Sequence, residues 1–307
     1  MKEIDSAQPS QTIEVLGRSL SVSNPNRILW PEVRFTKGQM VDYYRAIAPV
    51  LLPHLADRPI VLARFPAGVN GEYWYQTECP NPPDWLATCR IAKAGDPAQT
   101  FDYCVLQDEA SLVWAANLGA IELHPLLARV GSLDRPSAVV FDVDPGPGVG
   151  MGECCSIALM LRARLAVMDL SCHPKLSGSR GLHLYLPLNS PATHDGAKAF
   201  ARALAEEIVR EHPDLVTAKR ERASRSGKVL IDWAQNGRLR NLVAPYSLRA
   251  MPLPSVAAPL SWDEVESIAH QGAHVVTLLP SDVRARVEAT GDLLEPVLTQ
   301  RQRLPDP

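Results

Sequence analysis

The chain has 307 residues, of which 46% are hydrophobic and 21% charged, and its formal net charge is −3. This composition excludes a disordered or fibrous chain, and the length allows one large domain or two ordinary ones. The apolar runs are far shorter than the roughly 20 residues that cross a bilayer, so we expect no membrane span, and the acidic charge on its face disfavours an anionic partner.

Alternating apolar residues and helical spacings predict both strands and helices. In chain order we expect a mobile tail over residues 1–11, a hairpin over 12–23, a helix capped by Thr36, a buried strand over 59–65, a helix over 108–120, strands over 121–124 and 137–144, a helix over 152–168, a strand and loop over 174–187, a helix over 194–211, a strand over 228–233, a helix after Ser261, and a C-terminal tail over 296–307. Because strands and helices do not alternate strictly, the sequence predicts an α+β (mixed α/β) fold.

The six cysteines include no Cys-x-x-Cys pair, and Cys154 and Cys155 are adjacent. The sequence therefore predicts neither a zinc cage nor a disulfide framework. Acidic residues among the first few positions argue against a signal peptide. Together these features predict a protein of a reducing cytoplasm.

Asp142 and Asp144 end a predicted strand, so their side chains point to one face while that of Val143 points away. Two neighbouring carboxylates on an apolar strand need neutralisation, which a divalent cation would supply. Asp232 ends another apolar strand and would add a third carboxylate. Three such aspartates fit a site with two metal ions about 3.5–4 Å apart. The alternative is a strand-end pair that faces solvent or caps the next helix.

The segment Ser-Gly-Ser-Arg-Gly-Leu-His, from Ser177 to His183, predicts a cradle for phosphate. Its glycines allow close backbone approach, its hydroxyls and amides donate hydrogen bonds, and Arg180 and His183 add further donors. The segment is not a P-loop, because the chain contains no G-x-x-x-x-G-K-[ST] pattern. The alternative is an ordinary tight connection, with His183 as a core residue.

Two further features suit a polyanionic partner. Between Lys219 and Arg249 the sequence carries eight basic residues against two acids, although the whole chain is slightly acidic. Beside Arg64, exposed rings that could stack on bases would come from the cluster Phe65, Tyr73, Trp74 and Tyr75. A solvated basic face and ordinary core packing are the respective alternatives.

In order and spacing, four motifs resemble the polymerase domain of bacterial ligase D, within the archaeo-eukaryotic primase (primase-polymerase) superfamily. They are Phe141-Asp-Val-Asp-Pro145, Ser177-Gly-Ser-Arg-Gly-Leu-His183, Ile231-Asp-Trp-Ala-Gln-Asn236 and Ala244-Pro-Tyr-Ser-Leu-Arg249. The likeness runs from about Val22 to Glu295. It implies a primase-polymerase core over residues 12–295, with a central, mainly antiparallel β-sheet flanked by helices.

The resemblance also implies roles for individual residues. The family's catalytic triad matches Asp142, Asp144 and Asp232, which would bind two Mn²⁺ or Mg²⁺ ions for attack of a primer 3′-hydroxyl on an NTP or dNTP. Positions that hold the nucleotide match Ser177, Arg180, His183, Arg249 and His124. The pocket for a downstream 5′-phosphate matches Asn24, Arg27 and Lys37. Template or DNA contacts match Arg64, Trp74 and Tyr75.

The sequence departs from the family pattern at a few positions. Arg27 and Arg180 stand where lysine is common, Leu176 replaces a frequent threonine, and Thr77 replaces a frequent lysine, which puts one basic DNA contact in doubt. The chain has no ligase K-x-D-G motif and no phosphoesterase segment. We therefore expect either an excised domain or a stand-alone polymerase, and the start Met1-Lys-Glu-Ile and the variant residues favour the stand-alone polymerase.

The resulting hypothesis is a polymerase that fills short gaps in DNA, in gap repair or non-homologous end joining, and prefers ribonucleotides. That preference would require hydrogen-bond donors aimed at the 2′-hydroxyl, from Ser177 or His124. Expected partners are gapped or broken DNA with a 5′-phosphate, a separate DNA ligase and an end-binding protein, in the bacterial cytoplasm at the nucleoid. Two alternatives are a metal-dependent nuclease or phosphohydrolase and a noncatalytic module that bridges DNA ends.

Overall fold

The computed structural model describes residues 10–93 and 95–305. The predicted N-terminal tail lies outside these residues apart from Ser10 and Gln11, and Gln11 already belongs to β1 (Gln11–Val15). β1 pairs with β2 (Arg18–Val22), which confirms the predicted hairpin. In the described part of the chain, no helix is long and apolar enough to cross a membrane.

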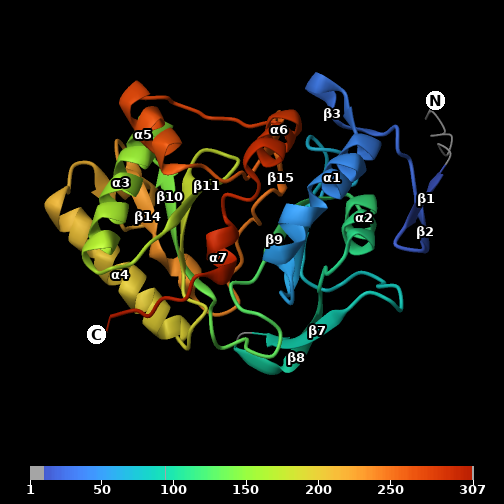
Figure 1. The fold of residues 1–307 in the computed structure, drawn as a ribbon, viewed down its shortest axis with the longest axis horizontal. Helices are drawn as coiled ribbons and strands as arrows, with labels where there is room; N and C mark the ends of the chain where they lie inside the picture. Colours follow the sequence, from blue (N-terminus) through green and yellow to red (C-terminus); the bar gives the residue numbers. More distant parts are fainter. Residues whose placement is uncertain (1–9, 94, 306–307) are drawn as a thin grey trace.

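Two five-stranded sheets organise the described residues (Figure 1). The first has the order β6-β5-β8-β7, and β9 also pairs with β5; its strands are β5 (Ile60–Arg64), β6 (Trp74–Gln76), β7 (Thr88–Lys93), β8 (Asp96–Cys104) and β9 (Ala120–Pro125). The second has the order β11-β12-β10-β14-β13; its strands are β10 (Ala138–Pro145), β11 (His173–Leu176), β12 (Leu182–Pro187), β13 (Val216–Thr217) and β14 (Val229–Asp232).

Helices pack against both sheets. The first sheet shares its core with α1 (Lys37–Leu55) and α2 (Glu109–Asn117). The second is covered by α3 (Met151–Val167) and α4 (His194–Glu211), and α5 (Trp262–Gln271) packs on α3. Within the second sheet only β13 and β14 pair in parallel. The predicted α+β fold, with a mainly antiparallel sheet flanked by helices, is confirmed.

Smaller elements complete the fold. They are β3 (Ile28–Trp30), β4 (Phe35–Thr36), β15 (Leu248–Ala250), β16 (Pro254–Val256), α6 (Pro280–Thr290), α7 (Glu295–Thr299) and the 3₁₀ turns η1 (Pro31–Val33), η2 (Arg222–Arg225) and η3 (Trp233–Asn236). Figure 1 shows β15 beside β9, so a segment late in the chain reaches the first sheet.

The strand β10 carries the predicted carboxylates because its side chains alternate between two environments. Val139, Phe141 and Val143 are fully buried in the core beneath the helices. The residues between them face the other side, where the strand ends in Asp142 and Asp144. The apolar face therefore anchors the strand, and its opposite face is free to carry charge.

The helix α1 begins as the sequence predicts. The side chain of Thr36 accepts a hydrogen bond from the backbone N–H of Gln39, and the Gln39 side chain accepts one from the Thr36 N–H, which forms a capping box. Met40, Ile47 and Leu51 then follow at helical spacing and are almost completely buried.

A disulfide joins Cys79, which follows β6, to Cys104, the last residue of β8, so the prediction of no disulfide is wrong. The two cysteines are 25 positions apart and meet because β6 and β8 both pair with β5. This long-range pairing leaves no pattern in the sequence, and the inference of a reducing compartment loses part of its support.

The segment after residue 295 was predicted as a tail, yet its described part packs against the second sheet. α7 contacts β12, and the side-chain amide of Gln302 donates to the carbonyl oxygens of Ser171 and Pro187 at 3.0 and 2.9 Å. The sequence also gave no signal for α6 or for the β7–β8 hairpin, whose alternation of apolar and polar residues is weak.

Candidate active site

Four residues of the second sheet form a row across neighbouring strands. Lys175 on β11 lies opposite His183 on β12, His183 opposite Asp142 on β10, and Asp142 opposite Asp232 on β14. Residues paired directly across strands share a face of the sheet. Two cation-forming side chains and two carboxylates are therefore aligned on the face that the helices do not cover.

The Asp142–Asp144 pair is short of positive charge. Burial, and next the carboxylate of Asp232, raise the pKa of Asp142 to about 7. Burial, and next Asp142, raise the pKa of Asp144 to about 6. The nearest basic group to Asp142 is the Nε2 atom of His183, at 3.4 Å. A divalent cation fits this pair, because it would neutralise both carboxylates at once.

The carboxylate of Asp232 is bonded to other groups. Nε and Nη2 of Arg220 both donate to its Oδ2 atom, at 2.8 and 2.5 Å, and the Ala234 N–H donates to Oδ1 at 3.0 Å. In the described residues no group of three His, Cys, Asp or Glu side chains could hold a metal ion. The three carboxylates therefore form no metal-holding group among the described residues, and the metal triad stays a prediction.

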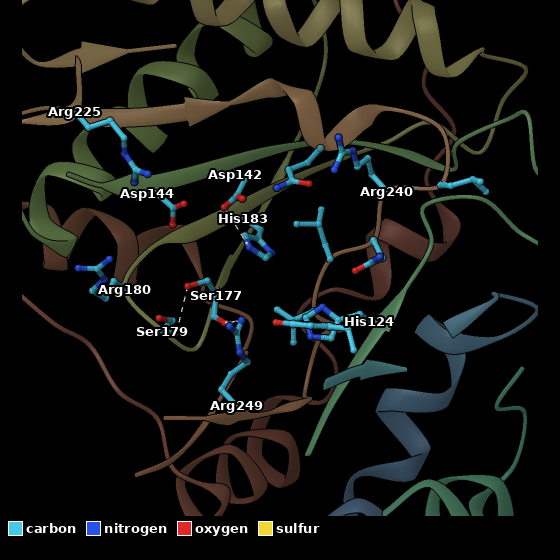
Figure 2. Close-up of a pocket in the computed structure, with 16 residues that line it drawn as sticks. His124, Asp142, Asp144, Ser177, Ser179, Arg180, His183, Arg225, Arg240 and Arg249 are labelled. Carbon is cyan, nitrogen blue, oxygen red and sulfur yellow. Dashed lines mark hydrogen bonds and ion pairs between the residues drawn. The ribbon is translucent and has the colours of Figure 1, made fainter. Parts of the chain in front are cut away.

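A cavity of about 550 Å³ opens beside the carboxylate pair (Figure 2). Asp142 and Asp144 line it together with every residue that the sequence assigns to the nucleotide, namely His124, Ser177, Arg180, His183 and Arg249. The template-contact candidate Tyr75 lines it as well. Residues from both sheets and from β15 therefore meet around one space.

The loop between β11 and β12 forms the side of the cavity labelled Ser177, Ser179 and Arg180 in Figure 2. The Ser177 hydroxyl oxygen accepts from the backbone N–H groups of Ser179 and Gly181, at 3.2 and 3.1 Å, which folds the loop tightly. A Cβ atom on Gly181 would lie 2.3 Å from the Val143 carbonyl oxygen, so glycine is required there. Arg180 is left exposed at the rim, available to an anion.

Glu122 on β9 belongs to the site, although the sequence analysis missed it. Its carboxylate accepts from His124 Nε2 at 2.8 Å, from Arg249 Nε at 3.0 Å and from the Ala250 N–H at 3.0 Å. The available signal was the Glu-x-His spacing, which places both side chains on one face of a strand. A second omission is Arg225, which also lines the cavity and whose Nε atom is buried without a partner.

The residues predicted to bind a 5′-phosphate lie at the N-terminus of α1. Lys37 is 6% exposed, and its ammonium group donates to the Ser23 carbonyl and hydroxyl oxygens and to Asn117 Oδ1, at 2.8, 3.0 and 2.7 Å. Burial, and next the charge of Arg27, lower the pKa of Lys37 to about 8. The Arg27 N–H donates to the Asn24 carbonyl and the Lys37 N–H donates to the Arg27 carbonyl, so backbone hydrogen bonds link the three residues.

The aromatic cluster is mostly exposed. Tyr73, Trp74 and Tyr75 are 58%, 41% and 56% exposed, whereas Phe65 is buried. The guanidinium of Arg64 lies 5.2 Å from the Trp74 ring centre, and the Tyr75 ring meets that of His124 edge-on at 5.4 Å. Ordinary core packing therefore accounts for only one of these four rings, and Tyr75 extends the cavity wall.

Comparison with known proteins places the chain in a class. Residues 36–294 match the family described as the LigD primase-polymerase domain. The polymerase domain of Mycobacterium tuberculosis ligase D, solved in complex with DNA, superimposes with a TM-score of 0.85 at 33% identity, covering 92% of this chain and 99% of that one. The fold is thus that of a primase-polymerase domain, as the motifs predict.

Longer relatives share the same segment. The multifunctional non-homologous end joining protein LigD of Mycolicibacterium smegmatis is 38% identical over 280 residues, which cover 90% of this chain and 36% of that protein. The bifunctional LigD of Bacillus subtilis is 30% identical, over 81% of this chain and 40% of that protein. The chain belongs to the LigD primase-polymerase domain family and spans little more than a third of the length of these relatives.

Proposed function

We propose that the chain is a metal-dependent nucleotidyltransferase that adds nucleotides to a primer at short gaps or breaks in DNA. The observation that carries this proposal is the juxtaposition of a buried and a half-buried carboxylate with a cationic, glycine-containing loop around one cavity. Carboxylates suit metal ions and the loop suits phosphate, and phosphoryl transfer needs both within one space.

Within this proposal the side chains divide the work. Asp142 and Asp144 hold Mn²⁺ or Mg²⁺, and Asp232 joins them after it leaves Arg220. When bound, two such ions activate the attacking oxygen and stabilise charge on the phosphate. The loop with Arg180 and His183 binds the triphosphate, together with Arg249.

The same proposal assigns DNA contacts outside the cavity. Arg27 and Lys37 bind the downstream 5′-phosphate beside Asn24, because a half-buried and a buried cation near a helix N-terminus favour a dianion. Arg64, Trp74 and Tyr75 offer exposed rings and charge to the template or the nucleotide base.

Gapped or broken DNA is the substrate in this proposal, and the names of the relatives support it. The structural neighbour was solved with DNA, and the curated relatives are named as non-homologous end joining proteins. These names support a role in end joining, with a DNA ligase and an end-binding protein as partners in the bacterial cytoplasm. A preference for ribonucleotides belongs to the same proposal.

Primer extension tests the proposal. A gapped duplex with a labelled primer is incubated with Mn²⁺ and either NTP or dNTP, and we expect longer primers, with more product from NTP. Asp144→Ala should reduce extension by about 1,000-fold or more, because it removes a carboxylate that holds the metal ions in this proposal. The exposed Asp263, in the first turn of α5, provides the control Asp263→Ala, which should extend normally.

The same gel separates the alternatives. Shortened primers would identify a nuclease or phosphohydrolase, and DNA binding with no change in primer length would identify a noncatalytic end-binding module. Full extension by Asp144→Ala would remove the assignment of the carboxylate pair.

A further inference from the structure

The side chain of Glu122 connects two cavity residues that come from different parts of the fold. His124 lies two residues further along β9, whereas Arg249 lies on β15. Glu122 is 4% exposed, and its two carboxylate oxygens are shared out: Oε2 receives His124 Nε2 and Oε1 receives Arg249 Nε and the Ala250 N–H. Such a buried and fully bonded carboxylate fixes the orientation of its partners.

The protonation states around Glu122 follow from its surroundings. Burial alone would raise the pKa of Glu122, but the hydrogen bond from His124 and the charge of Arg249 outweigh it and hold the pKa at about 2. Burial lowers the pKa of His124, against the opposing effect of the Glu122 carboxylate. At neutral pH Glu122 is therefore an acceptor only, and a neutral His124 must carry its proton on Nε2.

The other ring nitrogen of His124 is then a hydrogen-bond acceptor. The Nδ1 atom of His124 has no hydrogen-bond partner among the described residues. Two buried side-chain nitrogens there lack a partner, His183 Nδ1 and Arg225 Nε, and His124 Nδ1 is not one of them, so it is accessible from the cavity. The ring lines the cavity (Figure 2). The sequence suggested His124 as a donor to a sugar hydroxyl, whereas this geometry makes it an acceptor.

We propose that Glu122 is a positioning residue that fixes His124 as the Nε2–H tautomer and holds Arg249 in place, so that His124 accepts a hydrogen bond from a sugar hydroxyl of the nucleotide. The proposal deepens the proposed function and rests on it for the identity of the ligand. Arg249 is held from a second side as well, because its Nη1 atom donates to the Ser177 carbonyl oxygen at 2.7 Å. Glu122 thus links the sugar side of the cavity to the phosphate loop.

The variant Glu122→Gln inverts this polarity without changing side-chain size. The amide oxygen must take the place of Oε1, because Arg249 and the Ala250 N–H can only donate. The amide N–H₂ group then faces His124, whose Nε2 must accept, and the proton moves to Nδ1. Side-chain ¹⁵N NMR of the full chain at pH 7.5 should show Nε2–H in the wild type and Nδ1–H in the variant.

Nucleotide binding without primer gives the functional measurement. Titration with ATP, 2′-deoxyATP and 3′-deoxyATP in Mn²⁺ should show wild-type affinity reduced by about 5–10-fold on loss of one hydroxyl, the size of one hydrogen bond. Because a hydroxyl can also accept from Nδ1–H, the binding variant is Glu122→Ala, which removes the bond to His124 altogether and should bind all three nucleotides with nearly equal affinity. The control Glu264→Gln also removes a carboxylate that holds an arginine, Arg286 at 2.8 Å, and should lower stability without changing hydroxyl discrimination.

The outcomes separate this proposal from the proposed function. A wild-type His124 protonated on Nδ1 or on both nitrogens would overturn the positioning role, and so would a Glu122→Ala variant that keeps the hydroxyl discrimination. The wild-type NMR measurement decides the tautomer even where the variant does not fold. Nucleotide binding with hydroxyl discrimination but no primer extension would leave Glu122 its role and overturn only the polymerase assignment.

Discussion

The end of β10 gathers carboxylates, whereas the N-terminus of α1 gathers cations. Burial, together with a like charge nearby, raises the pKa of Asp142 to about 7 and lowers that of Lys37 to about 8. The same physical cause acts with opposite sign, since each cluster disfavours its own charge. Each is therefore suited to a counter-charge from outside, a metal ion at β10 and a phosphate at α1.

The two clusters differ in how their polar atoms are satisfied. The ammonium group of Lys37 donates to three oxygens, which hold it in place before any ligand arrives. The Asp142 carboxylate lies 3.4 Å from His183 Nε2, and the third carboxylate is bonded to Arg220. The proposed phosphate site is thus preorganised, whereas in the proposed metal site Asp232 must leave Arg220 before it can bind a metal ion.

The largest expected effect comes from Asp142→Asn, which should separate stability from activity. Because the native state holds a carboxyl with a raised pKa, it binds more protons than the unfolded chain between about pH 4 and pH 7, so wild-type stability falls as pH rises through that window. In EDTA at pH 8 the variant should be more stable than the wild type by about 1–2 kcal/mol. In Mn²⁺, the variant should lose primer extension. Thermal unfolding at pH 5.5 and pH 8 measures this, and a variant less stable than wild type at pH 8 would contradict the repulsion.

A smaller effect is expected when Asp232 is released. Arg220→Ala removes the ion-pair partner of a buried carboxylate, so the melting temperature in EDTA should fall. The free energy of unfolding should fall by only about 1 kcal/mol, because the Arg220 side chain is 49% exposed and solvent screens the pair. Added Mn²⁺ should then raise the melting temperature of the variant more than that of the wild type, because a free Asp232 can bind the ion. Thermal shifts with and without MnCl₂ test this.

Arg238→Ala is the matched control for that comparison. Arg238 also pairs with an aspartate, Asp134, but that aspartate is 86% exposed in its side chain and lies in no cavity described above. The control should respond to Mn²⁺ as the wild type does. Equal Mn²⁺ shifts for Arg220→Ala and wild type would mean that Asp232 does not contribute to metal binding.

The sequence predicts local features of both clusters and misses their long-range bonds. The strand β10 and the helix cap at Thr36 depend on residues close in sequence, so both were predicted. The row that aligns His183 with Asp142 depends on strand register, which no local pattern specifies. The Arg220–Asp232 pair and the Glu122 bonds depend on side-chain contacts that form only in the folded chain. The Cys79–Cys104 disulfide depends on the order of strands in the sheet.

The smallest expected effect is a pH dependence confined to the phosphate site. Only the protonated ammonium of Lys37 attracts a phosphate, and its pKa of about 8 means that it loses this charge at lower pH than an ordinary lysine. Preference for gapped DNA with a 5′-phosphate over a 5′-hydroxyl should therefore fall about 3–10-fold from pH 7 to pH 9 at constant salt, with the midpoint displaced above 8 because bound phosphate favours the proton. Fluorescence anisotropy with the two duplexes measures the ratio.

Lys37→Arg should keep a constant preference over this range, since arginine stays charged, and Lys37→Ala should show little preference at any pH. A wild-type ratio as constant as that of Lys37→Arg would place the phosphate elsewhere and break the symmetry between the two clusters.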